Sequence, residues 1–390
     1  MAALSLIATI GGRFYGRSGM SEYQYYEFQT IDRRLTAEEQ AEIKKLSSRV
    51  QLTPTQAIFL YNYGDFRSKP EQVLTQYFDM MFYIANWGTW RLIFRFPKAI
   101  ADPKWFQPYD LPDAVTISQT HQYVVLDINI QEEEGIGGWV DGEGWLSQLL
   151  PLREELLSGD LRLLYLVWLR VAPYLAGYGL ADDPLEPPIP ANLDQLSAPL
   201  QAFIELVELD RDWVAAAAQA SPRAEAASNL PIENWLSQLP DAERQEFLLK
   251  LVRREPHVDL QLINRLKELA SAGRSAPQSI PGQRRLSELG AIAHTAKTTR
   301  EQKEQSAARK KRIQELETLA KQEAQLWTRV IELIALKQSK PYDEATALLK
   351  DLRDVAEHQE RLPAFIQRIE KLKADYSNRP GLLTRLRTIK

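Results

Sequence analysis

The chain has 390 residues, which is long enough for two or three domains. Of these residues 44% are hydrophobic and 26% are charged, as is typical of globular proteins. It contains no cysteine, which excludes disulfides, thiolate nucleophiles and zinc or iron–sulfur centres held by cysteine. The net charge is only −4, yet residues 284–390 hold 23 Lys and Arg against 15 Asp and Glu, whereas residues 101–225 hold 6 against 21. An acidic middle followed by a basic tail is more typical of a protein that assembles with partners than of an enzyme.

The first 19 residues are predicted to be a disordered lead or an over-called start. Residues 2–10 are apolar, but no Lys or Arg precedes them as in a secretory signal. Met20 opens the patterned sequence. The best membrane candidate, residues 161–180, is interrupted by Arg162 and Arg170 and therefore predicts a buried helix. These observations favour a cytoplasmic protein without a membrane partner.

The N-terminal region then begins with a strand, a helix and a second strand. Apolar side chains fall on both faces of a strand over residues 23–29. Thr36 and Glu39 have the spacing of a capping box, in which each side chain binds the other's backbone N–H, and predict a helix to about residue 48. Residues 57–63 predict the next strand.

A second helix is expected over residues 70–84, because a proline opens it and apolar residues recur along it. Asn86 and Gly88 would supply the left-handed geometry that ends this helix. Trp87, between that helix and a strand, is expected to be buried between layers.

Two alternating segments, residues 91–96 and 122–131, predict further strands. In the first, Leu92, Phe94 and Phe96 share one face, and Arg91, Ile93 and Arg95 share the other. We therefore expect an α+β N-terminal domain over residues 20–180, with an antiparallel or mixed sheet. Its sheet would have one face on helices and one partly wet.

The remainder predicts a mainly α-helical middle and a helical-bundle C-terminal tail. Five prolines in residues 181–199 indicate a linker or a wrapping loop, and residues 200–270 indicate a helical segment. A linker and a polar helix are expected over residues 271–312. Amphipathic segments with short connections predict a helical interaction module over residues 313–390.

Two arginines on the predicted sheet form the first candidate site. Arg91 and Arg95 share a strand face and could bind an anion or nucleic acid, helped by exposed Tyr23 and Tyr25. The preferred alternative pairs both arginines with Glu27 or other acids across the sheet.

A basic run in the tail forms the second candidate site. Arg309, Lys310, Lys311 and Arg312 could contact phosphates, and such binding would weaken with salt. Glutamates interleave upstream, and the preferred alternative is that these charges only keep an uncovered helix in solution.

No catalytic signature accompanies these candidates. The sequence has no P-loop, no dinucleotide-binding glycine motif and no nucleophile elbow. The four histidines lack a ligand-like spacing. We therefore predict no catalytic residue, no cofactor and no metal.

Two segments resemble known families. At the N-terminus, the segments 25–29, 32–35, 52–55, 64–66, 77–79 and 85–91 (YYEFQ, DRRL, LTPT, GDF, YFD and ANWGTWR) together resemble a family of bacterial hypothetical proteins without an assigned activity. At the C-terminus, the segments 342–353, 379–380 and 383–386 (YDEATALLKDLR, RP and LTRL) resemble the helical tail of some bacterial SWIM zinc-finger proteins. Those fingers bind zinc through Cys and His, and this chain has no Cys, so the second resemblance implies only a shared docking tail.

The sequence therefore favours a non-enzymatic cytoplasmic adaptor or assembly protein that docks on a protein partner through helices. The first alternative is a nucleic-acid-associated accessory protein that uses the basic tail. The second is an enzyme with a site around Asn86, Trp87, Arg91 and Arg95.

Overall fold

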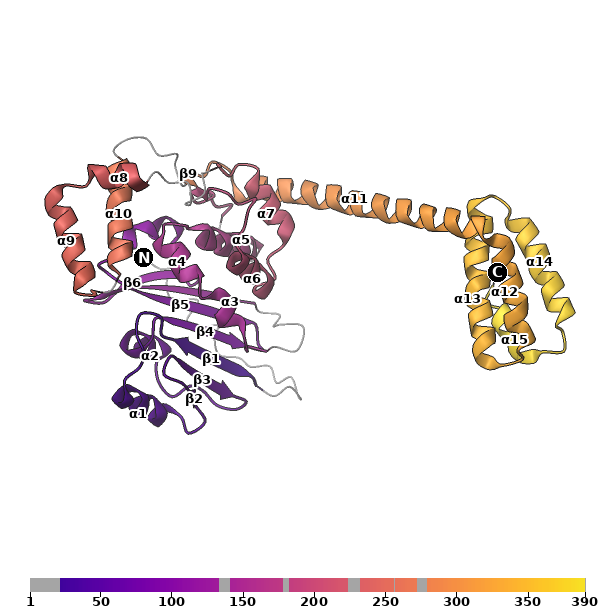
Figure 1. Ribbon diagram of the computed structural model, residues 1–390, viewed down its shortest axis with the longest axis horizontal. Helices are drawn as coiled ribbons and strands as arrows, with labels where there is room; N and C mark the ends of the chain where they lie inside the picture. Colours follow the sequence, from indigo (N-terminus) through magenta and orange to yellow (C-terminus); the bar gives the residue numbers. More distant parts are fainter. Residues whose placement is uncertain are drawn as a thin grey trace. The chain divides into compact units, whose positions relative to one another are not determined.

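A computed structural model describes residues 22–132, 141–177, 182–223, 232–255, 257–271 and 279–389 (Figure 1). The residues predicted as a lead, 1–19, lie outside the described ranges. The chain divides into two compact units, Met1–Ala296 and Lys297–Lys390. The first contains an antiparallel sheet with helices and the second is helical, which confirms the predicted fold class.

The first unit is organised around a seven-stranded sheet in the order β2-β3-β1-β4-β5-β7-β6. Every neighbouring pair is antiparallel. The strands are β1 (Gln24–Gln29), β2 (Gln51–Leu52), β3 (Gln56–Tyr61), β4 (Met80–Ala85), β5 (Thr89–Pro97), β6 (Val115–Gln119) and β7 (Tyr123–Gln131). The strands expected from alternation are thus present, with bounds shifted by one or two residues.

The helix expected over residues 70–84 is wrong in its second half. Helix α2 (Pro70–Tyr77) is short, and the residues that follow form β4, which lies between β1 and β5. Every residue of β4 is buried. A continuous apolar run of this length suits a central strand covered on both faces as well as a buried helix. Gly88, at φ 91°, turns the connection between β4 and β5 and ends no helix.

Both faces of the sheet are buried at its central strands. At the β7–β6 end one face is partly wet as expected, because Thr116 and Ser118 are exposed and Asp127 and Asn129 are half-buried. One face packs Phe28, Phe59 and neighbouring rings against α1 (Ala37–Leu46) and α2. The opposite face packs against helices that follow the sheet in sequence. These helices are α3 (Trp145–Leu149), α4 (Leu152–Leu157), α5 (Arg162–Gly177), α6 (Ala198–Leu206) and α7 (Arg211–Ala218). The Thr36–Glu39 capping box is present and begins α1.

The proline-rich residues 182–199 pack as a wrapping loop within the first unit. Ile189–Pro190 (β8) pairs with Ser279–Ile280 (β9). Glu186 is buried and accepts hydrogen bonds from the Tyr165 hydroxyl and from Nε of Arg284 at 2.8 Å. Gly282 permits this approach, because a Cβ there would lie 2.0 Å from the Glu186 carbonyl oxygen.

The first unit also carries the helices α8 (Ile232–Gln238), α9 (Asp241–Val252) and α10 (Val258–Ser271). The long helix α11 (Leu286–Lys321) begins in the first unit and ends in the second. Its residues 301–312 are exposed, in agreement with the polar helix predicted there. In the predicted linker, residues 272–278 lie outside the described ranges.

The second unit has a hydrophobic core of its own. Helices α12 (Glu323–Ala335), α13 (Ser339–His358), α14 (Leu362–Asp375) and α15 (Pro380–Leu386) all contribute to it. Trp327 and Phe365 lie at its centre, with ring centroids 5.8 Å apart. None of the described helices in either unit has the length and apolar character needed to cross a bilayer.

The position of Trp87 contradicts the expectation of a buried ring. It lies in the turn between β4 and β5 with 43% of its surface exposed. We therefore predict that Trp87→Ala changes the free energy of unfolding by less than about 1 kcal/mol. Phe82→Ala, in the middle of β4 and fully buried, should cost about 3–5 kcal/mol because it leaves a cavity. Urea denaturation of both variants measures the contrast, and equal losses would place Trp87 in the core.

Candidate functional site

Arg91, on β5, is neutralised by two carboxylates. Its Nε lies 2.9 Å from Oδ1 of Asp127 and its Nη2 lies 2.6 Å from Oδ2, so the contact is bidentate. Glu71, on α2, accepts a further hydrogen bond from Nη2. Burial alone would lower the pKa of Arg91, but the hydrogen bonds and charges of Asp127 and Glu71 raise it above its ordinary value. Arg91 is therefore bound by acids from a neighbouring strand and a helix, as expected if the arginines of this strand pair with acids of the chain instead of an external anion.

Arg95, four residues after Arg91 on the same face of β5, is buried beneath other side chains. Its Nη2 lies 2.5 Å from Oδ1 of Asp79, and its Nη1 donates to the Thr75 carbonyl oxygen at 2.9 Å. The Tyr123 ring covers the guanidinium, with 4.4 Å between Cζ and the ring centroid. Arg91 and Arg95 thus share one face as predicted, but both are occupied by protein groups. Tyr25, expected as an exposed aromatic beside them, is buried and on the opposite face.

The carboxylate of Asp79 links Arg95 to a second charged group. Its Oδ2 accepts hydrogen bonds from the backbone N–H of Ile31 at 2.6 Å and of Asp32 at 3.0 Å. These two donors fix the loop that follows β1, and the loop places the Asp32 side chain. Oδ2 of Asp32 in turn lies 2.9 Å from Nη2 of Arg153 and 3.2 Å from Nε2 of His257.

Arg153, on α4, is fully buried and depends mainly on Asp32 for charge balance. Its Nη1 lies 3.5 Å from Oε1 of Glu154, whose side chain is 56% exposed, and this nitrogen has no hydrogen-bond partner among the described residues. Its Nε donates to the Arg95 carbonyl oxygen at 3.4 Å. A buried guanidinium that loses its carboxylate is left as an uncompensated charge.

Asp32 and His257 shift each other's protonation equilibria. Burial raises the pKa of Asp32, but the hydrogen bond from His257 and the charge of Arg153 outweigh it and the pKa is lowered overall. The hydrogen bond to Asp32 raises the pKa of His257 above 6.5, against the opposing effect of burial. The contact with Asp32 therefore favours the protonated form of His257, which donates to the carboxylate.

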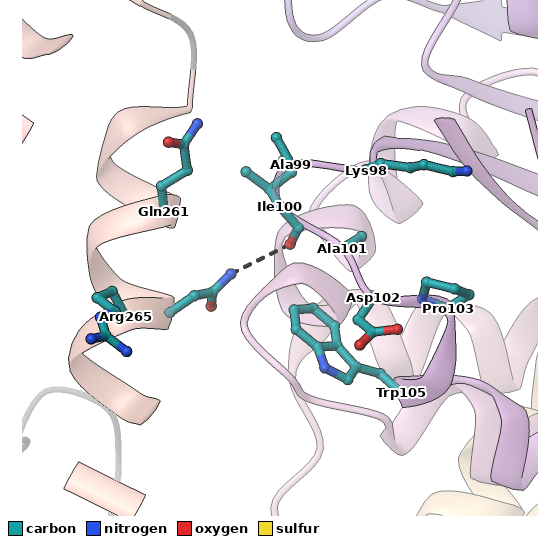
Figure 2. A pocket seen from close by; sticks show the side chains of 10 residues that line it. Lys98, Ala99, Ile100, Ala101, Asp102, Pro103, Trp105, Gln261 and Arg265 are labelled. Atoms are coloured by element: carbon teal, nitrogen blue, oxygen red, sulfur yellow. Dashed lines mark hydrogen bonds between the residues drawn. The ribbon is translucent and has the colours of Figure 1, made fainter. Parts of the chain in front are cut away.

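Two surface grooves lie near this network. The first, of about 490 Å³, separates α10 from the loop over residues 98–105. Figure 2 shows Trp105 and Gln261 on opposite sides of it, with Lys98 turned away from α10. Nδ2 of Asn264 crosses the groove to the Ile100 carbonyl oxygen at 3.4 Å. This groove presents no pair of acid and base side chains to a common point.

The second groove, of about 530 Å³, lies over the end of α2 and the turn between β6 and β7. Tyr123, which covers Arg95, lines it together with His121 and the amide and hydroxyl side chains of Gln72, Thr75, Gln76, Thr120 and Gln122. Its lining includes no carboxylate and no Lys or Arg. Within the described ranges, no group of three or more His, Asp and Glu is placed to hold a metal ion.

The basic run, residues 309–312, lies on the part of α11 that belongs to the second unit. Arg309, Lys310 and Lys311 are exposed and form no ion pair among the described residues. Arg312 differs, because it binds Asp354 of α13 and lies 3.6 Å from Glu315. Of the four predicted contacts, three present a free cation and one is already neutralised.

Comparisons with protein-family models, curated proteins and solved structures found no match to this chain. The two family resemblances therefore stay predictions. The sequence analysis also missed the network of Asp32, Asp79, Arg153 and His257. One signal was present, since Arg153 lies between Leu152 and the pair Leu156 and Leu157, which are spaced as the apolar face of a helix. His257 gave none, because its contact depends on the turn between α9 and α10.

The network predicts unequal costs for breaking the same ion pair from its two ends. Asp32→Asn leaves the guanidinium of Arg153 buried without its main counter-charge, and should cost about 3–5 kcal/mol of unfolding free energy. Arg153→Met fills the site with an apolar chain and leaves Asp32 with His257, so the cost should be smaller. Chemical denaturation of both single variants and the double variant tests this order. If Arg153→Met is the more damaging change, Asp32 is not the group that balances Arg153.

The contact between His257 and Asp32 also predicts a pH dependence. Because the folded-state pKa of His257 is raised above 6.5, its stabilisation is complete below that pH and is lost as pH rises through the folded pKa. His257→Gln should therefore cost about 1.5 kcal/mol at mildly acidic pH and progressively less at alkaline pH. Urea unfolding of both proteins between about pH 5.5 and pH 9 measures the difference. A difference that is constant across this range would contradict the assignment.

Proposed function

We propose that the chain is a non-enzymatic cytoplasmic adaptor whose helical second unit docks on a protein partner. The observation that carries the proposal is the core of that unit. Lys297–Lys390 encloses its own apolar cluster, centred on Trp327, Leu349 and Phe365, so it can fold and present a surface by itself. All residues of this core come from the second unit itself, and none comes from the sheet of the first unit.

The charged groups of the first unit support the same proposal. Arg91, Arg95 and Arg153 are each bound by carboxylates of the chain, so their positive charges are already balanced within the protein. Nε2 of His257 lies 3.2 Å from the Asp32 carboxylate, and this contact raises the pKa of the imidazole and favours its protonated form. The geometry therefore favours an architectural role for these residues over catalysis.

Two truncations test the proposal. Residues 297–390 alone should give a helical circular dichroism spectrum and a cooperative thermal transition. In cells, this fragment and the full chain should form cross-links to the same partner, identified by mass spectrometry, and residues 1–296 should not. A partner that stays cross-linked to 1–296 would show that the second unit is not the docking surface.

A nucleic-acid accessory role is the second candidate, and the free cations of α11 favour it. Three phosphate contacts by Arg309, Lys310 and Lys311 would give a plot of log affinity against log salt with a slope of about −2 to −3. Against it, Trp327 and Tyr342, the large aromatics of α12 and α13, are buried and offer no stacking surface for bases.

Fluorescence titration with single-stranded and duplex nucleic acid at two salt concentrations separates the two candidates. The adaptor predicts no salt-sensitive binding. If binding is found, Lys310→Glu with Lys311→Glu should abolish it, whereas Arg312→Gln should change it little because Arg312 already binds Asp354. Salt-sensitive binding with that pattern would replace the adaptor by the second candidate.

A further inference from the structure

Helix α9 (Asp241–Val252) lies at the edge of the first unit and has no buried residue (Figure 1). Its second half nevertheless contains four large aliphatic side chains. Leu248, Leu249, Leu251 and Val252 are 57%, 53%, 49% and 81% exposed. Single exposed aliphatic residues are common on proteins, but several on two turns of one helix form a patch that favours association.

The helix has an inward and an outward face. Glu243, Phe247 and Lys250, spaced by four and three residues, are the half-buried positions, and Glu243 binds Arg265 of α10. The opposite face carries Gln245, Leu248, Leu249 and Val252, at the spacing of one helical stripe. We call these four residues the α9 stripe. It faces away from the unit's own core and is unpartnered among the described residues.

Opposite charges stand on one flank of the α9 stripe. Glu246 and Arg253 are seven residues apart, which is about two helical turns and places them on the same flank. Glu246 contacts only Lys250 of its own helix, at 2.7 Å with both side chains partly exposed, a kind of pair that contributes little. Arg253 is exposed and forms no ion pair within the described ranges. The flank is thus acidic toward its N-terminal end and basic at its C-terminal end.

We propose that the α9 stripe binds the α9 stripe of a second copy of this chain, antiparallel and across a two-fold axis. Such an axis reverses the helix direction and keeps the same flanks together. Glu246 of each copy then faces Arg253 of the other, and Leu248, Leu249 and Val252 pack at the centre. The opposed helix dipoles add to the attraction. A self-complementary flank is a requirement of a two-fold interface and not of a surface for an unrelated partner.

The interface centred on one short helix is small. A stable protein interface usually buries about 800 Å² on each partner and involves about 20–30 residues. Helix α9 has only 12 residues, so it supplies less than this area. The dimer is therefore a weak one, with a dissociation constant on the order of micromolar. The proposal is independent of the adaptor function, because it concerns the first unit and the adaptor surface lies in the second.

Sedimentation velocity of the full chain from roughly 1 to 100 µM should show a concentration-dependent dimer. Leu248→Glu with Val252→Glu should abolish it, and the fold should survive because both side chains are exposed. Ile331→Glu, at a similarly exposed aliphatic position on α12, is the matched control and should leave the dimer intact. A chain that is monomeric throughout, or a dimer that survives the double change in α9, overturns the proposal.

A charge exchange tests the antiparallel arrangement itself. Glu246→Arg and Arg253→Glu should each weaken the dimer, by about five- to tenfold, because each places like charges opposite one another twice. The double variant restores opposite charges at both positions and should recover most of the lost affinity. Failure of the double variant to recover would overturn the arrangement, since no other partner of the α9 stripe predicts recovery.

Discussion

The carboxylate of Asp79 makes the contacts that hold the centre of the sheet to the loop after β1. Asp79 is 1% exposed and lies at the point where α2 has ended and β4 begins. One of its oxygens binds Arg95 and the other accepts two backbone N–H groups of the loop after β1. Its own N–H and carbonyl groups bond to Gln29 and Arg95, so it joins β1 and β5 to the loop that carries Asp32.

The position of that loop decides what the buried cations can do. Asp32 reaches Arg153 on α4 and His257 before α10, so one chain of charges connects the sheet to two helical elements. Because the central strands of the sheet are covered on both faces, a cation buried there is stable only with a carboxylate or a ring against it. This requirement explains why the arginines of β5 are bound by carboxylates of the chain itself.

The sequence was informative wherever one physical signal dominated. Alternation over residues 91–96 and 122–131 located β5 and β7, and the Thr36–Glu39 capping box located the start of α1. Alternation failed for β4, because its residues are buried on both faces and no polar side marks the strand. Trp87 was misplaced by the same error, since a turn between strands exposes a residue that a helix end would have covered. The charge network could not be predicted from the sequence. Its members, Asp32, Asp79, Arg153 and His257, come from four separate segments that only the tertiary fold brings together.

Hydrogen exchange at two backbone amides tests the central role of Asp79 most directly. The N–H groups of Ile31 and Asp32 lie in a loop outside any strand or helix, and Ile31 is 39% exposed. Loop amides of this kind usually exchange quickly. Because both donate to the buried Asp79 carboxylate, they should exchange as slowly as the amides of β5. Rapid exchange at both, with β5 protected, would contradict the account.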